Sequence, residues 1–108
     1  MADFQSTIDF ETFTRLDLRV GTITSAEHHP DADRLLKISL DDGSEAGRQI
    51  CAGVRAWYED PGALVGTQVV FIANLEPRTI RGEISEGMIL AGTAADAEGN
   101  ATDVCLLR

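Results

Sequence analysis

The side chains best suited to chemistry in this sequence are its basic ones, and eight of the nine are arginine. A guanidinium group donates paired hydrogen bonds to a phosphate and stacks on a flat base, and it is less strongly hydrated than a lysine ammonium. Arg34, Lys37, Arg78 and Arg81 therefore form a candidate phosphate-binding set. The alternative for each is an ion pair with a neighbouring acid, such as Arg34 with either aspartate of segment 31–33.

Catalytic and metal-binding chemistry has little support. None of the signatures GxSxG, HExxH, GxxxxGK[ST] or GxGxxG occurs. His28 and His29 are adjacent, and neighbours on a strand point to opposite sides, so we expect a solvated loop pair rather than ligands of one metal. Cys51 and Cys105 lie in apolar stretches without a CxxC motif, which predicts two buried free thiols. We expect no enzyme activity, no cofactor and no metal.

The charge balance is strongly acidic. There are 18 acidic residues against nine basic ones, which gives a formal net charge of −9. A protein that coats membranes or binds nucleic acid non-specifically needs the opposite sign. Two interpretations stay open: an acidic surface suited to concentrated salt, where screening removes self-repulsion, and a simply acidic protein.

Length and hydropathy predict one domain over residues 1–108, in the cytoplasm. A chain of 108 residues is long enough for one modest core. Its longest apolar runs, such as 69–73, are far shorter than the ~20 residues that a membrane helix needs. The first residues lack the basic and apolar regions of a signal peptide. We therefore expect no membrane association.

The elements that must position the basic residues are mostly short strands. The first long strand is expected over 18–26, where Leu18 and Val20 share a face and Ile23 falls out of phase. A bulge at Gly21 would restore the phase and curve the strand. The other expected elements are a short helix capped by Asp9, strands at 36–40 and 48–52 joined by an Asp42-Gly43 turn, a helical turn at 54–58, a helix from Pro61 to Gly66, strands at 68–74, 88–91 and 104–107, an Arg81-Gly82 turn and a polar loop at 94–102.

This order, β-β-β-α-β-β, is typical of an all-β fold with short helices, a five-stranded Greek-key barrel of the OB type, here with N- and C-terminal extensions. The alternative, a small sandwich, leaves the central helical insert unexplained. OB barrels bind nucleic acid on strands 2–3 and on the loops between strands 1–2 and 4–5. Arg34 and Lys37, and Arg78 and Arg81, fall in those places. Aromatic residues are only 6% of the chain, which favours folded RNA over single strands that need stacking platforms.

Four ordered segments resemble the stand-alone tRNA-binding domain family. That family includes the C-terminal appendage of methionyl-tRNA synthetases, the endothelial monocyte-activating polypeptide domain and the secretion chaperone CsaA. The resemblance runs from about Ile8 to Leu107. The segments that carry it are LDLRVG at 16–21, HPDADRLL at 29–36, ANLEPR at 73–78 and ISEGMIL at 84–90.

The resemblance implies an OB barrel that binds the outer corner of tRNA without catalysis. Carried onto this chain, it implies contacts from Arg34, Asn74, Arg78, Ser85 and Met88. Arg34 would bind a phosphate, Asn74 and Ser85 would bind base edges or ribose, and Met88 would pack on an unstacked base. The alternatives are a turn residue for Asn74 and a core residue for Met88. The following Glu86-Gly87 pair is expected to shape the turn.

Two features depart from the family pattern. The family's binding face is usually basic, whereas this chain is acidic, although Arg34 keeps the charge where lysine is common. The sequence also contains no synthetase body, so we expect a module that acts in trans as a tRNA chaperone or synthetase accessory. Two alternatives remain: an export chaperone that binds unfolded polypeptides, and a module that docks on a synthetase.

The resemblance also implies a homodimer, and the ends of the chain agree with it. Phe4, Ile8, Phe10 and Phe13 near one end, and the segment 104–107 at the other, are more apolar than loose termini need. Pairing of two copies through these ends would bury them and cover strand edges. The alternative is that they close one end of the barrel within a single copy.

Overall fold

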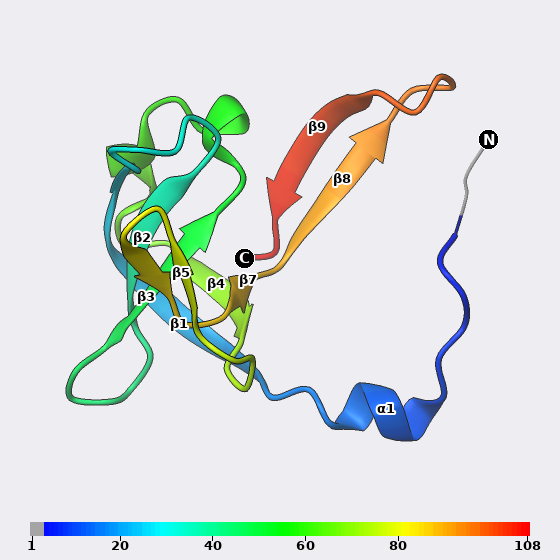
Figure 1. Ribbon diagram of the computed structural model, residues 1–108, viewed down its shortest axis with the longest axis horizontal. Coiled ribbons are helices and arrows are strands. Elements are labelled where there is room, and N and C mark those ends of the chain that lie inside the picture. The colour runs from blue at the N-terminus through cyan, green and yellow to red at the C-terminus, as the bar shows by residue number, and fades with distance from the viewer. Residues whose placement is uncertain (1–3) are drawn as a thin grey trace.

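The computed structural model describes residues 4–108 as a β-barrel with two projecting extensions (Figure 1). Short helices are few and strands dominate. In chain order the elements are α1 (Phe10–Thr14), β1 (Leu18–His28), β2 (Leu36–Asp41), β3 (Arg48–Ala52), the 3-10 turns η1 (Arg55–Trp57) and η2 (Pro61–Leu64), β4 (Gln68–Ile72), β5 (Arg78–Ile80), β6 (Glu83–Ser85), β7 (Met88–Ile89), β8 (Ala91–Ala95) and β9 (Ala101–Leu106).

The barrel is one five-stranded antiparallel sheet in the order β3-β2-β1-β4-β7. It nearly closes because the chain around β6 returns to β3. There the Ser85 hydroxyl accepts a bond from the Cys51 nitrogen at 2.9 Å, and the Glu86 nitrogen donates to the Gln49 carbonyl at 2.8 Å. The OB-type barrel predicted from the sequence is confirmed.

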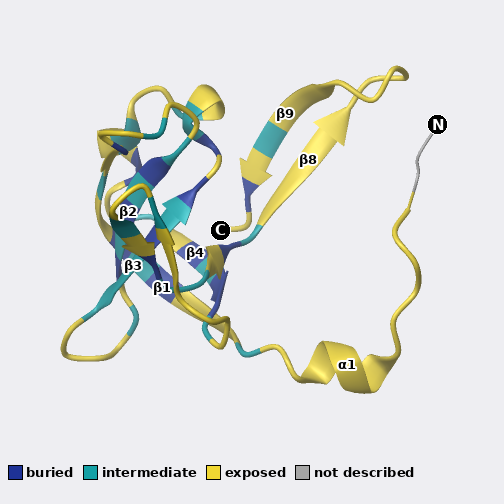
Figure 2. Cartoon of the chain, in the orientation of Figure 1, coloured by how far each residue is buried: buried dark blue, intermediate teal, exposed yellow. Residues whose placement is uncertain are grey.

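The core lies inside this barrel (Figure 2). Leu36, Ile38 and Leu40 of β2 point inward and are at most 2% exposed, as the alternation of β2 predicts. Phe71 from β4 is fully buried among them. Placing these side chains in one interior removes them from water, which is the main favourable contribution to folding.

The predicted bulge at Gly21, which would place Leu18, Val20 and Ile23 on one face of β1, is wrong. Leu18 and Val20 are 41% and 61% exposed, whereas Gly21 and Ile23 are buried. A Cβ at Gly21 would lie 3.0 Å from the ring of the buried Phe71, which shows that this position faces the core. The irregularity in β1 lies between Ile23 and Ser25, in its pairing with β2, and not at Gly21.

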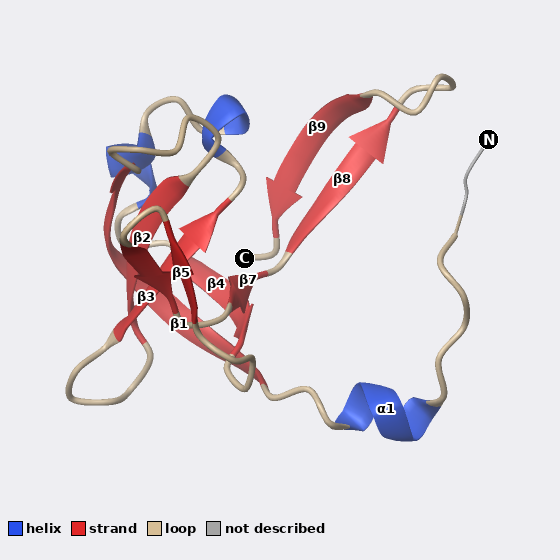
Figure 3. Ribbon diagram, viewed as in Figure 1, coloured by secondary structure: helices blue, strands red, loops and turns tan. Residues whose placement is uncertain are grey.

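Several shorter segments also differ from the prediction. The insert between β3 and β4 forms two 3-10 turns rather than an α-helix. The Arg81-Gly82 turn is confirmed, but it joins two strands that the sequence analysis did not identify, β5 and β6. The segment 94–102 is a loop only at residues 96–100, and its two ends belong to β8 and β9 (Figure 3).

The two extensions leave apolar side chains uncovered. Asp9 caps α1 as predicted, and Phe10 and Phe13 lie 77% and 46% exposed on it. Nearly every residue of β8 and β9 is exposed. The N-terminal phenylalanines therefore do not close the barrel within this chain.

Cys51 is half-buried and Cys105 is exposed, so the expectation of two buried thiols is wrong for Cys105. Cys105 lies on β9 between the half-buried Val104 and the buried Leu106, so its side chain points to the opposite, exposed side of the strand. Within residues 4–108, no helix is long and apolar enough to span a bilayer.

Candidate nucleic-acid interface

The β1–β2 loop carries Arg34 and is anchored by a buried histidine. His29 is 2% exposed, so the predicted solvated histidine pair is wrong for this residue. Its Nδ1 accepts a bond from the Asp31 nitrogen at 3.0 Å, which leaves the ring proton on Nε2. Nε2 then donates to the Ile80 carbonyl at 2.9 Å. The imidazole therefore joins the β1–β2 loop to the β5–β6 hairpin.

Arg34 and Arg81 meet across this junction. They line one shallow hollow of about 390 Å³ together with Ile80 and the loop residues 31–33. Both side chains are exposed, and within residues 4–108 neither makes an ion pair. Asp31 and Asp33 thus line the hollow without neutralising Arg34 by direct contact. Arg81 sits in the turn with φ 48°, beside Gly82.

Arg78 belongs to the same hairpin. It is exposed, lies two residues before Ile80 on β5 and so points to the same side of the strand. No ion pair involves it in the part of the chain that the structure describes. The structure therefore brings three of the predicted contact residues, Arg34, Arg78 and Arg81, to one end of the barrel.

Lys37 is in a different electrostatic situation. Its Nζ lies 2.9 Å from Glu27 Oε1 and 3.3 Å from Glu83 Oε1. The hydrogen bond with Glu27, followed by that with Glu83, raises the pKa of the lysine ammonium. A phosphate would have to compete with two carboxylates already in place. Lys37 as an RNA contact stays a prediction that this pairing disfavours.

Two other predicted contacts use their polar groups inside the protein. The Asn74 side chain accepts a bond from the Asp17 nitrogen at 2.9 Å and donates to the Arg15 carbonyl at 2.6 Å. It thereby fastens the chain between α1 and β1 to the end of β4. Ser85 is 6% exposed and its hydroxyl bonds to β3 and to the Gly87 carbonyl. Their RNA-binding roles remain predictions, to which the structure adds structural roles.

Met88 lies on another surface. It is 54% exposed, so it is not a core residue. It pairs with Ile72, which pairs with Leu18 on its other side, and opposed residues in neighbouring strands share a face. We call the exposed residues of this sheet face and its border the outer apolar face: Leu18, Val20, Met88 and Leu107. The structure does not bring Met88 to the hollow of Arg34 and Arg81.

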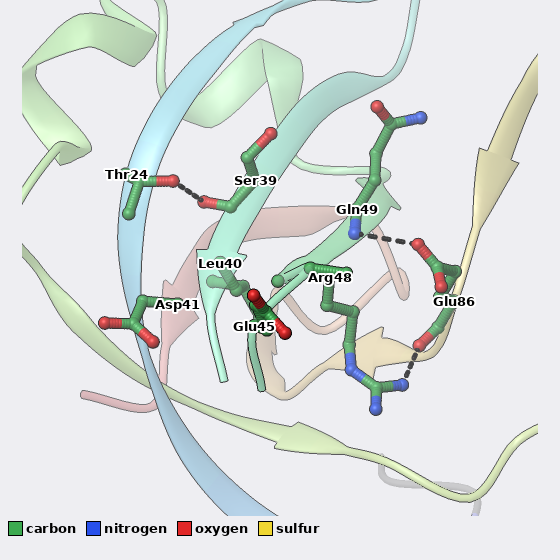
Figure 4. A pocket seen from close by; sticks show the side chains of 10 residues that line it. Thr24, Ser39, Leu40, Asp41, Glu45, Arg48, Gln49 and Glu86 are labelled. Atoms are coloured by element: carbon green, nitrogen blue, oxygen red, sulfur yellow. Dashed lines mark hydrogen bonds between the residues drawn. The ribbon is translucent and has the colours of Figure 1, made fainter. Parts of the chain in front are cut away.

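Arg48 and Glu86 hold the closing edge of the barrel together and line an open hollow there (Figure 4). Arg48 donates to the Glu86 carbonyl at 2.6 Å and lies 5.2 Å above the ring centre of Phe71. The Glu86 carboxylate accepts a bond from the Gln49 nitrogen at 3.1 Å. Gly87 has φ 140°, and a Cβ there would lie 2.5 Å from the Ile72 carbonyl oxygen. The expectation that Glu86-Gly87 shapes the turn agrees with these contacts.

Asp42 supports Arg48 from the β2–β3 loop. Its carboxylate accepts bonds from the Ser44 hydroxyl at 2.6 Å and the Ser44 nitrogen at 2.9 Å, and pairs with Arg48 at 3.1 Å. The Ser44 bonds, followed by Arg48, lower the pKa of Asp42 from 3.8 to about 2. The carboxylate is therefore charged at neutral pH.

A second hollow, which the sequence did not predict, lies next to Arg34. It is lined by Arg34, Arg55 and Trp57, among others. Arg55 donates to the carbonyls of His29 and Ala32 at 3.4 and 3.2 Å. The available signal was the only tryptophan of the chain, placed in a turn and two residues after an arginine.

An OB barrel that presents exposed arginines on two adjoining loops, with no ion pair to them within residues 4–108, has the features of a small binding module. The chain belongs to the family described as "Putative tRNA binding domain", whose model matches residues 18–106. That family is one of non-catalytic binding modules.

Proteins with similar sequences and structures support the assignment to this family. The chain is 52% identical over 93 residues to a methionine–tRNA ligase of Chlorobium limicola, covering 86% of this chain but only 13% of the ligase. It resembles the chaperone CsaA of Bacillus anthracis with a TM-score of 0.75 and 35% identity, over 95% of this chain and 89% of CsaA. A MetRS-related protein of Pyrococcus horikoshii gives a TM-score of 0.75 at 27% identity, over 94% and 89%.

Proposed function

We propose that this protein binds folded tRNA without catalysis and acts in trans, as a tRNA chaperone or an accessory of an aminoacyl-tRNA synthetase, in the cytoplasm. The proposal rests on a difference between the basic residues, some of which are paired with carboxylates while others are not. Arg19, Lys37 and Arg48 are paired with carboxylates, whereas Arg34 and Arg81 are exposed in one hollow without such partners among residues 4–108. Two guanidiniums that share one hollow can bind one anion together through charge-assisted hydrogen bonds.

Folded RNA suits this arrangement better than a flexible strand. The barrel exposes few aromatic side chains on which successive bases could stack. The arginines extend from two loops that a buried imidazole joins, so the spacing of their main-chain positions is fixed. Recognition by shape needs such fixed contacts to phosphate and ribose.

The first test is fluorescence anisotropy of labelled bulk tRNA, from low salt to molar KCl, with single-stranded DNA as competitor. We expect binding that unlabelled tRNA competes away and that the DNA does not. A shallow salt slope would also indicate that hydrogen bonds and stacking outweigh counterion release, as a protein adapted to concentrated salt requires. Absence of tRNA binding at every salt concentration would refute the proposal.

We further propose that two copies pair through the outer apolar face and the projecting ends. The chain exposes 7482 Å² of surface. A compact monomer of its mass exposes about 5,800 Å². The excess of about 1,700 Å² in one chain is larger than the roughly 800 Å² that each partner loses in a standard dimer interface, so such an interface would cover part of it. The radius of gyration of 14.6 Å is likewise above the roughly 13 Å typical of this length.

The second candidate function is that of an export chaperone for unfolded polypeptides. The exposed outer apolar face favours it, since such patches bind apolar segments of other chains. The resemblance to CsaA points the same way. If the two copies cover this face, it is not free for a polypeptide. Binding of an unfolded reduced protein that tRNA does not displace would favour the chaperone over the tRNA binder.

A further inference from the structure

The hollow next to Arg34 has the size and lining of a ligand site. Its volume is about 570 Å³, within the range of small-molecule sites. Its lining includes an aromatic ring, two guanidiniums and two carboxylates. The side chains that matter are Trp57, Arg34, Arg55, His28, Asp33 and Glu59.

Trp57 is presented on a rigid turn. The indole is 40% exposed although the turn that carries it is fixed at both ends. The main-chain nitrogen of Trp57 donates to the carbonyl of the buried residue Val54 at 3.0 Å. Next to it, the Tyr58 hydroxyl accepts a bond from the Leu106 nitrogen at 3.1 Å. An aromatic face held in this way loses little conformational entropy when it binds a flat ligand.

The two arginines supply the charge that a nucleotide needs. Arg55 bonds to two neutral carbonyl groups, which fix its position and do not cancel its charge. Arg34 lines both this hollow and the adjoining one, where Arg81 lies. Asp33 also lines both hollows and Glu59 lines the hollow of Trp57, so a phosphate binds only where a guanidinium outweighs their repulsion. A phosphate bound by Arg34 therefore lies at the border between the two hollows.

We propose that this hollow takes one unpaired base of the RNA, stacked on Trp57, with the adjacent phosphate bound by Arg34. The inference rests on the tRNA-binding function proposed above. Stacking on an indole is tolerant of base identity because every base presents a π face. The backbone then continues from Arg34 to Arg81, which makes the two hollows one track. An apolar peptide side chain fits less well, since it would desolvate the guanidiniums without pairing them.

Trp57 is the only tryptophan in the protein, so intrinsic fluorescence reports directly on this site. The experiment titrates the protein with bulk tRNA and follows tryptophan emission alongside the anisotropy of labelled tRNA. We expect quenching that follows the anisotropy curve. Trp57→Ala should weaken tRNA binding about ten-fold, and Trp57→Phe should restore most of the affinity. Val65→Ala, at an exposed apolar residue of the same β3–β4 connection outside the hollow, should bind as the wild type does.

The outcomes separate this inference from the proposed function. Anisotropy that reports binding while emission stays unchanged, or a Trp57→Ala variant that is folded by circular dichroism and binds normally, overturns the base site and leaves tRNA binding intact. If the wild-type protein changes neither the anisotropy of labelled tRNA nor its own tryptophan emission on titration, the proposed function itself is refuted. Quenching by an unfolded reduced protein but not by tRNA overturns the base site in favour of a polypeptide site.

Discussion

Replacing Arg34 tests whether its unpaired charge binds a phosphate. Arg34→Ala and Arg19→Ala both change the formal net charge from −9 to −10, so the long-range repulsion between protein and RNA rises equally in the two variants. They differ locally, because Arg19 already pairs with Asp17 at 3.0 Å, whereas Arg34 has no carboxylate partner within residues 4–108. The comparison therefore isolates one local contact from the effect of overall charge.

The expected magnitude follows from one phosphate contact. Loss of such a contact reduces the slope of log K against log salt concentration by about 1. A hydrogen bond to a charged group contributes about 1.5 kcal/mol or more, so tRNA affinity should fall about ten-fold for Arg34→Ala. For Arg19→Ala the slope should stay unchanged, because a phosphate does not replace its carboxylate partner. Lys37→Met should behave like Arg19→Ala, since two carboxylates hold that ammonium.

The assay is anisotropy of labelled bulk tRNA at a series of KCl concentrations, with circular dichroism to confirm that each variant is folded. The reasoning is refuted if Arg34→Ala keeps the wild-type slope. It is also refuted if Arg19→Ala loses as much slope as Arg34→Ala, because the effect would then come from net charge alone.

Three further predictions concern assembly and stability. Light scattering after gel filtration should show a dimer of twice 11.6 kDa for the wild type and a monomer for Val20→Glu. Val65→Glu, at a similarly exposed valine elsewhere, should remain a dimer. A monomeric wild type would contradict the proposed dimer. Gly87→Ala should lower the free energy of unfolding by about 3 kcal/mol in urea titrations because of its clash and positive φ, whereas Gly99→Ala, with open space around it, should cost about 1 kcal/mol; equal costs would contradict the contact. Because the pKa of Asp42 is lowered to about 2, its contribution to stability is present above pH 3.8 and is lost as the pH falls toward 2; Asp42→Asn should therefore lose less stability than the wild type over that interval.

The barrel could be predicted where each strand has one apolar face. The alternation of Leu36, Ile38 and Leu40 identified β2 and its inward face because the opposite side chains are polar. The same rule failed in β1, where Leu18 and Val20 are apolar on the outside of the barrel. A pattern of apolar residues identifies a strand but not its inner face when both faces are apolar.

The projecting hairpin of β8 and β9 could not be predicted for the opposite reason. Apart from residues 104–106, which fall in a predicted strand, its residues are small or polar and exposed, so no hydrophobic period marks them as strands. Main-chain hydrogen bonds between the two strands hold them together, and any sequence with a suitable turn can make such bonds.

The site was predictable in part. The positions of Arg34, Arg78 and Arg81 in the loop and hairpin at one end of the barrel follow from the order of the elements. Their freedom from ion pairs does not, and neither does the pairing of Lys37, because Glu83 lies far from Lys37 in the sequence and approaches it only after β6 folds back over the barrel.

The buried imidazole of His29 has a consequence for how selective the binding is. By joining the loop of Arg34 to the hairpin of Arg81, it fixes the spacing of the main-chain positions from which the two cations extend before any RNA arrives. An RNA whose phosphates already stand at that spacing binds without reorganising, whereas a flexible strand loses conformational entropy to match it. A weakly aromatic, acidic protein can thus discriminate between RNAs of identical composition by their rigidity alone.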